Sequence, residues 1–134
     1  MLTLLTLRCG HAGFVLLACG GGGRMNAISK LTVSAAAAQR VIDAGVDEAR
    51  RMGIAASIAV VDESGILRAF HRMDGAALVT VSSSQDKAFT AVGFGIASHA
   101  WYPMIKDDPA LLHGVPSAIE RIVIFGGGVP ITVD

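Results

Sequence analysis

Cysteine is confined to the start of this chain, at Cys9 and Cys19. The residues that follow have none, which excludes a disulfide framework or a thiolate metal site there. Aromatic residues make up only 5% of the chain, too few to form stacking platforms for nucleic-acid bases. The net charge is 0, and Arg50 and Arg51 are the only adjacent basic pair, so there is no basic footprint for phosphates. These absences predict that nucleic acid is not the partner.

No run of apolar residues reaches the roughly 18 to 20 that a membrane-spanning helix requires. Hydrophobic residues nevertheless make up 52% of the chain and charged residues 16%, which favours one ordered domain over a disordered segment. The mean hydropathy of +0.57 is high for a chain of this size. A small domain cannot hide that much apolar surface internally, so the composition predicts a homo-oligomer.

The first 24 residues differ from the rest, and three interpretations compete for them. The run ending in Ala18-Cys19 resembles a lipoprotein signal, although its one basic residue, Arg8, follows an apolar stretch. A transmembrane helix would need a longer apolar run. The glycine-rich stretch before Met25 resembles a ribosome-binding site read in frame. We therefore predict a translation start at Met25, a domain over residues 25–134 and a cytoplasmic location. Export or lipid anchoring is the alternative.

Hydrophobic periodicity predicts a helix that begins after the N-cap Ser34 and ends at Gly53. A β-branched run over residues 55–61, apolar on both faces, is typical of a strand covered on both sides. The turn residues 62–65 and a second strand over residues 66–72, whose side chains alternate between two faces, complete a hairpin. The stripe that the helix is predicted to bury comprises Ala37, Val41, Ala44, Glu48 and Met52.

The second half of the chain is predicted to contain a helix over residues 80–96, followed by an irregular stretch over 98–109 and a turn over 113–117. Strands are predicted over residues 119–125 and 129–133, separated by Gly126-Gly127-Gly128. Antiparallel strands with helices laid against them indicate an α+β fold.

Five motifs from residue 31 onward resemble the GlcG/HbpS family, whose fold also occurs in the C-terminal domain of PduO-type corrinoid adenosyltransferases. They are Leu31-Thr32 before an alanine-rich helix, Ser57 to Asp62 followed by Gly65, Arg72 to Ala76, Lys87-Ala88 with Thr90-Ala91, and Gly126 to Ile131. They follow the order and approximate spacing of the family.

The resemblance implies a profilin-like antiparallel sheet with helices packed against it, assembled into oligomers. It also implies haem binding and, in some members, haem degradation or iron sensing. Relatives normally continue with one more strand and a final helix, which this chain lacks after Asp134. The resemblance therefore raises the expectation that another chain supplies the strand, or that the reading frame is truncated.

Six residues are candidates for ligand binding. Asp62 and the loop Arg72–Asp74 are expected to form a polar pocket, in which Arg72 holds a carboxylate or haem propionate in a bidentate way. Alternatively, Asp62 caps a turn and Arg72 pairs with Asp74 or a neighbouring subunit. Lys87 and Thr90 lie three residues apart on one helix and either line a polar site or belong to a solvated helix end.

A haem iron needs an axial ligand, and His71 is the candidate nearest to the Arg72 loop. A histidine on a strand face can equally be a packing or solvated residue. The other candidate ligands are His99, His113, Met73 and Met104. The loop from Ser98 to Tyr102 suits a porphyrin edge or a subunit interface.

Asp43, Asp47 and Glu48 carry carboxylates at helical spacing, but Arg50 and Arg51 balance them, so the sequence predicts no metal site. The three glycines at 126–128 lack the GK[ST] sequence of a phosphate loop and are expected to allow close backbone packing. There is no recognisable catalytic triad, and whether the chain is an enzyme stays open. The leading hypothesis is a haem-binding oligomer. The alternatives are a protein acting on a small organic acid, held by Arg72 and Lys87, and a structural subunit completed by a partner's strand.

Overall fold

The computed structural model describes residues 3–5, 17–19 and 29–132 of the chain. Two short strands, β1 (Thr3–Leu5) and β2 (Leu17–Cys19), pair antiparallel near the N-terminus. Most of the segment 1–24 lies outside the described residues, so the start at Met25 stays a prediction. No helix within the described ranges is long and apolar enough to cross a membrane.

Helix α1 (Ala35–Arg51) begins and ends where the sequence predicts. The Ser34 hydroxyl accepts a hydrogen bond of 3.1 Å from the Ala37 amide, which caps the first turn. Gly53 follows the last turn with φ +70, a conformation that favours glycine.

The predicted buried stripe of α1 is wrong by one residue. Val41 and Met52 are 41% and 59% exposed, whereas the buried side chains are Ala38, Ile42, Val46 and Ala49. One residue corresponds to a rotation of 100° about the helix axis. The stripe that is buried carries Ile42 and Val46, which remove more apolar surface from water than Ala37 and Ala44 would.

Strands β3 (Ser57–Val61) and β4 (Leu67–Arg72) form the predicted antiparallel hairpin, with Ser57 opposite Arg72 and Val61 opposite Leu67. Among the described residues each of these strands pairs only with the other. Their register is regular except for one shift between Val60 and Val61.

The two faces of β3 are covered by different helices, which confirms the prediction of a strand covered on both sides. Ile58 and Val60 belong to the core that α1 completes. The helix approaches closely because Gly45 faces the strand: a Cβ on it would lie 3.2 Å from Ile58 Cδ1. On the opposite face, the Ser57 hydroxyl lies 2.7 Å from that of Thr80, the first residue of α2 (Thr80–Phe94).

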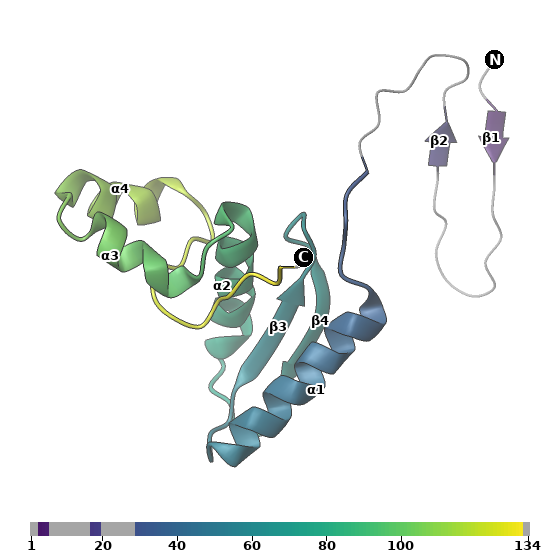
Figure 1. Ribbon diagram of the computed structural model, residues 1–134, viewed down its shortest axis with the longest axis horizontal. Helices are drawn as coiled ribbons and strands as arrows, with labels where there is room; N and C mark the ends of the chain where they lie inside the picture. The colour runs from purple at the N-terminus through teal and green to yellow at the C-terminus, as the bar shows by residue number, and fades with distance from the viewer. Residues whose placement is uncertain (1–2, 6–16, 20–28, 133–134) are drawn as a thin grey trace.

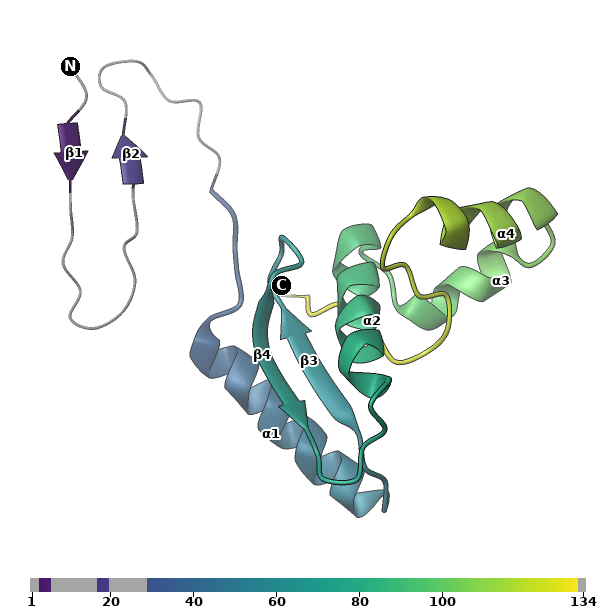
Figure 2. The same ribbon diagram turned by 180° about the vertical axis from the view of Figure 1, so that it is seen from behind.

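Helix α2 runs in the same direction as β3 (Figures 1 and 2). Thr80 lies beside Ser57 at the start of the strand, and Phe89 packs against Gly65 at the turn that follows it. A Cβ on Gly65, which has φ +77, would lie 2.7 Å from the Phe89 ring. These two contacts fix the direction of α2 along the sheet.

The predicted turn over residues 113–117 is wrong, because these residues belong to helix α4 (Pro109–Ala118). The Asp108 carboxylate accepts hydrogen bonds from the Ala110 and Leu111 amides, and Pro109 occupies the first helical turn. A short 3-10 helix, η1 (Ser98–Ala100), and helix α3 (Trp101–Ile105) replace most of the predicted irregular stretch. Together α3 and α4 form a helical pair beside α2 (Figure 1).

The predicted strands over 119–125 and 129–133 are also not found: residues 119–132 contain no strand, and residue 133 lies outside the described ranges. The segment crosses α2 instead of joining the hairpin (Figure 1). Its backbone bonds to α2 and η1: the Val123 amide donates to the Thr90 hydroxyl at 2.9 Å, and the Gly128 carbonyl accepts from the Ser98 amide at 2.9 Å. The α+β class is confirmed, with a hairpin between helices α1 and α2.

Candidate functional site

Asp62 is a turn residue. Its carboxylate oxygen Oδ1 accepts hydrogen bonds of 3.0 Å from the backbone amides of Ser64 and Ile66. Its own amide and carbonyl bond to Ile66 and Gly65, which closes the hairpin. This geometry matches the alternative in which Asp62 caps the turn, because its carboxylate already accepts two backbone amides.

Arg72 holds its own loop together. Its guanidinium donates two hydrogen bonds to the Ala76 carbonyl oxygen, from Nε at 3.1 Å and from Nη2 at 2.6 Å. Asp74 lies in the intervening turn and is exposed. No ion pair joins Arg72 and Asp74 in the part of the chain that the structure describes.

The pocket expected between Asp62 and the Arg72 loop does not form. Arg72 lies opposite Ser57 at one end of the hairpin, and Asp62 follows Val61 at the other end. The five residues of β3 separate the two ends by about 17 Å at roughly 3.3 Å per residue.

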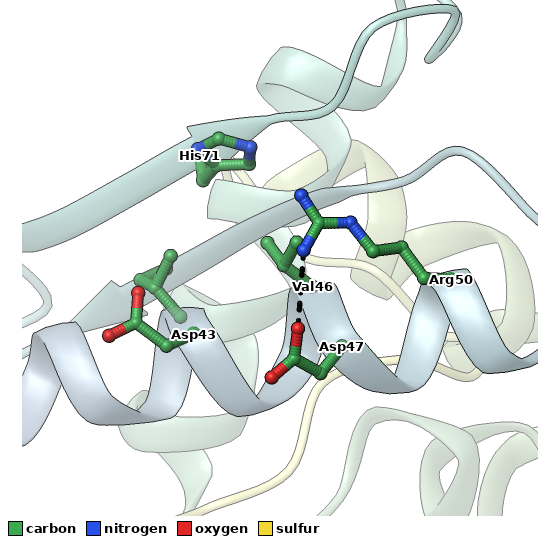
Figure 3. A pocket seen from close by; sticks show the side chains of 6 residues that line it. Asp43, Val46, Asp47, Arg50 and His71 are labelled. Atoms are coloured by element: carbon green, nitrogen blue, oxygen red, sulfur yellow. Dashed lines mark hydrogen bonds and ion pairs between the residues drawn. The ribbon is translucent and has the colours of Figure 1, made fainter.

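His71 and Arg72 point to opposite faces of the hairpin, as neighbours on a strand do. His71 contributes to an open groove against α1 (Figure 3). The groove has a volume of about 330 Å³. Buried Ile42 and Val46 form its floor, and its rim carries Asp43, Asp47 and Arg50.

The charges at the rim of this groove are partly neutralised by one another. Arg50 donates to Asp47 at 3.2 Å, and both side chains are exposed. Asp43 accepts a hydrogen bond of 2.8 Å from Gln39 one turn earlier. A guanidinium has five N–H donors, so Arg50 keeps donors for a ligand carboxylate. Within the described residues no three His, Cys, Asp or Glu side chains converge on a metal-binding point.

Lys87 and Thr90 both face the C-terminal segment. The Lys87 ammonium lies 4.6 Å from the centre of the Phe125 ring, in a cation–π contact. A Cβ on Gly128 would lie 2.2 Å from the Lys87 carbonyl oxygen, so a side chain there would collide with α2. This contact confirms that the glycines allow close backbone packing.

The Thr90 hydroxyl is buried and fully used. It donates toward the carbonyl oxygens of Asp86 and Arg121, at 2.8 and 3.1 Å, and accepts from the Val123 amide. It therefore fastens the C-terminal segment to α2. Asp86 adds an ion pair of 2.8 Å with Arg121 at the same place.

Ser98, three residues after the α2 C-cap Gly95, also fastens the C-terminal segment, and the sequence analysis did not identify it. Its buried hydroxyl donates to the Phe125 carbonyl at 2.8 Å and accepts from the Gly128 amide at 2.9 Å. No local sequence signal marks this serine, because both partners lie about thirty residues further along the chain.

Arg72 and Lys87 do not converge on one small carboxylate. Arg72 lies at the Thr80 end of α2, because Ser57 is its strand partner and contacts Thr80. Lys87 follows Thr80 by seven positions in the helix, about 10 Å along the axis. The six candidates thus occupy four places: the turn, the Arg72 loop, the α1 groove and the underside of the C-terminal segment.

The remaining candidate haem ligands lie apart from the groove. Met73 packs against the core, whereas Met104 on α3 is 66% exposed. His113 is exposed on α4, and His99 lies against Gly126. In the aromatic loop, Trp101 packs edge-on against Phe94 at 4.6 Å. His71 is the one candidate among the five that lines the groove.

Comparison with known proteins gives a consistent result. Residues 33–134 match the family described as haem degrading protein HbpS-like. Protein GlcG of Escherichia coli is 32% identical over 106 residues, which is 79% of this chain and 76% of GlcG.

Two solved structures share the fold. The ORFY protein of Klebsiella pneumoniae, of family DUF336, superimposes with a TM-score of 0.76 at 27% identity, over 84% of this chain and 78% of that one. The PduOC–haem complex superimposes with a TM-score of 0.67 at 28% identity, over 72% of this chain and 70% of that one.

Proposed function

Because the chain belongs to the HbpS-like family, we propose that it binds haem, in the groove between α1 and β4. The observation that carries the proposal is His71, an exposed imidazole over the apolar floor of Ile42 and Val46. The PduOC–haem complex supports the choice of ligand, since PduOC is similar in fold and sequence.

The residues of the groove fit the chemical parts of haem. A histidine nitrogen is a common axial ligand of haem iron, and aliphatic side chains suit a porphyrin face. Arg50 offers N–H donors to a propionate, the geometry that guanidinium groups bind best. Haem would supply an iron centre, while this chain's residues bind and orient it.

The groove is at the lower end of the size range of ligand pockets and is open, so one subunit leaves part of a porphyrin exposed. In this proposal the protein is a homo-oligomer, and a neighbouring subunit covers the part of the porphyrin that one subunit leaves exposed. Its location in the cytoplasm stays a prediction.

The test is a hemin titration of the full chain, followed by absorbance. We expect a saturable Soret band, and the dissociation constant rises at least about tenfold in His71→Ala, which removes the axial ligand. Arg50→Gln should weaken binding less than His71→Ala does, because it removes one contact to a propionate and leaves the axial histidine in place.

His113→Ala is the matched control: His113 is exposed like His71 but lies on α4, away from the groove. It should leave the titration unchanged. An unsaturable absorbance change would reject haem binding. A saturable band that survives His71→Ala would place the haem elsewhere.

A further inference from the structure

Lys87 is the one partly buried lysine or arginine in the part of the chain that the structure describes; the others there are exposed. A partly buried ammonium normally has an oxygen atom to accept its hydrogen bonds, because an unpaired charge is costly to remove from water. Within the described residues Lys87 Nζ has neither an ion pair nor a hydrogen bond. What faces the ammonium is the Phe125 ring, whose centre is 4.6 Å away.

The carboxylate next to Lys87 in sequence is already paired. Asp86 Oδ1 accepts a hydrogen bond of 2.8 Å from Arg121 Nε. The Arg121 guanidinium also lies over the Phe89 ring, 4.3 Å from its centre, which holds it in this position. Asp86 and Arg121 therefore neutralise one another, and the single positive charge of Lys87 remains for another anion.

The Lys87 ammonium can be reached from outside. Among the described residues, Trp101 Nε1 is the one fully buried side-chain nitrogen or oxygen that lacks a hydrogen-bond partner. Lys87 Nζ also lacks one, so it is not fully buried. The glycines Gly126 and Gly127 beside it are exposed and carry no side chains that would cover it. A Cβ on Gly127 would lie 3.1 Å from Lys87 Nζ, so the ammonium lies directly against this glycine.

Two further side chains flank the exposed glycines. Phe125 precedes them and is 59% exposed, so its ring offers apolar surface to the carbon atoms of a ligand. His99 is exposed and lies against Gly126, where a Cβ would be 3.6 Å from the histidine Cβ. An imidazole carries an N–H donor for a ligand oxygen. Ring, imidazole and ammonium thus gather around three consecutive residues, 125–127.

The backbone at this place is held on both sides. The Val123 amide donates to the Thr90 hydroxyl on α2 before the glycines. After them, the Gly128 amide donates to the Ser98 hydroxyl, which itself donates to the Phe125 carbonyl. The segment therefore crosses α2 in a fixed path (Figure 1). A surface that is already ordered loses little conformational entropy when a ligand binds.

We propose that Lys87, Phe125 and the two exposed glycines form a second ligand site, which binds a small monocarboxylate. The carboxylate lies on the Lys87 ammonium, and the carbon atoms of the ligand lie on the Phe125 ring. One ammonium supplies one positive charge, which matches a monocarboxylate better than a phosphate dianion. The site is on the α2 side of the sheet, whereas the groove is on the α1 side, so the inference does not rest on haem binding.

The test is an NMR titration of the full chain with sodium acetate, without hemin and at an ionic strength held constant with sodium chloride. The amide resonances of Gly126 and Gly127 should shift and reach saturation. Lys87→Met keeps the length of the side chain and removes its charge. It should raise the dissociation constant for acetate at least about tenfold, because it removes a hydrogen bond to a charged group.

Lys106→Met is the matched control, since Lys106 is exposed and pairs with Asp107. It should leave the dissociation constant for acetate unchanged. The ¹⁵N resonance of Lys87 Nζ makes the test independent of how well Lys87→Met folds. In the wild-type chain this resonance should move with acetate along the same saturation curve as the glycine amides.

Benzoate tests the part assigned to Phe125. Its ring adds apolar contact area, so benzoate should bind several-fold more tightly than acetate. Phe125→Ala should remove this difference while the Lys87 Nζ resonance still responds to acetate. Equal affinities for benzoate and acetate in the wild-type chain would contradict the role of the phenylalanine.

Shifts that grow in proportion to acetate without saturation, or that chloride alone reproduces, would overturn the proposal. A dissociation constant for acetate that is the same in Lys87→Met and the wild type would do so as well. Inorganic phosphate that binds at least about tenfold more tightly than acetate would assign the site to phosphate and reject the monocarboxylate. The hemin titration is a separate experiment, so either proposal can fail without the other.

Discussion

Gly128 lies directly against the carbonyl oxygen of Lys87, at the point where the C-terminal segment crosses α2. A Cβ at this position would come within 2.2 Å of that oxygen and 2.7 Å of the carbonyl carbon. Backbone atoms in the middle of a helix cannot move aside as the end of a flexible side chain can. The close crossing therefore depends on the absence of a side chain.

Gly128→Ala should destabilise the protein by about 1–3 kcal/mol, the usual cost of overpacking. Denaturant unfolding, followed by the fluorescence of the single tryptophan, Trp101, measures this. Gly93→Ala is the control, since a Cβ on Gly93 would meet nothing within 4 Å. Alanine also has the better helix propensity, so the control should be neutral or stabilising. Equal losses in the two variants would contradict the steric argument.

Thr90→Val keeps the shape of the side chain and removes its hydroxyl. The Val123 amide then loses its acceptor, and an unsatisfied donor costs about 1–3 kcal/mol where it is shielded from water. The unfolding free energy should fall by that amount. Ser82→Ala, at an exposed position earlier in α2, should change it by less than about 0.5 kcal/mol. A Thr90→Val protein as stable as the wild type would mean that water replaces the hydroxyl.

The pKa of Glu48 lies below its ordinary value because Arg51 donates hydrogen bonds to its carboxylate. Arg51→Gln should raise this pKa toward the ordinary value, as measured by an NMR titration of the carboxyl carbon. Because the folded-state pKa is the lower one, the bond stabilises the folded state fully at pH values above the unfolded-state pKa of Glu48. This stabilisation is lost as the pH falls through the folded-state pKa.

Because this pair is exposed, salt should weaken the shift of the Glu48 pKa. Arg50→Gln is the control, since Arg50 pairs with Asp47. A Glu48 pKa that does not respond to Arg51→Gln would assign the shift to another neighbour.

The first half of the fold could be predicted because its signals are local. Ser34, Gly53 and Gly65 mark a helix start, a helix end and a turn, and each acts through residues nearby in sequence. The buried stripe of α1 was harder to predict, because a second apolar stripe lies one residue away on the same helix. Only the sheet decides that Ile42 is buried and Val41 is exposed.

The helix predicted over residues 80–96 is found as α2, but the chain after it was mispredicted because long-range contacts override local preference. The β-branched run from Ile122 to Ile124 has the composition of a strand. In the structure Arg121 adopts φ +65 and the next segment bonds to the Thr90 side chain. Similarly, Gly114 and Pro116 suggest a turn, but the cap at Asp108 starts a helix that includes them.

The candidate site was predicted residue by residue and not as an arrangement. Sequence order places Asp62 and Arg72 near one another, whereas a hairpin separates its turn from its open end. Lys87 and Thr90 contact the C-terminal segment that carries the glycines, and all of them belong to the family motifs found in the sequence. Which of the six candidates contact a ligand stays a prediction, and His71 is the one that lines the groove.

The hairpin at the centre of this fold is too small to be stable alone, since two strands in water are marginal. Among the described residues β3 and β4 have no other strand to pair with, so α1 and α2 hold the sheet in place. The order of folding follows from this dependence. We expect α1 to form from contacts close in sequence and the hairpin, marginal by itself, to persist only once α1 has docked on it. The strand amides should therefore gain protection from hydrogen exchange together with α1 and not before it.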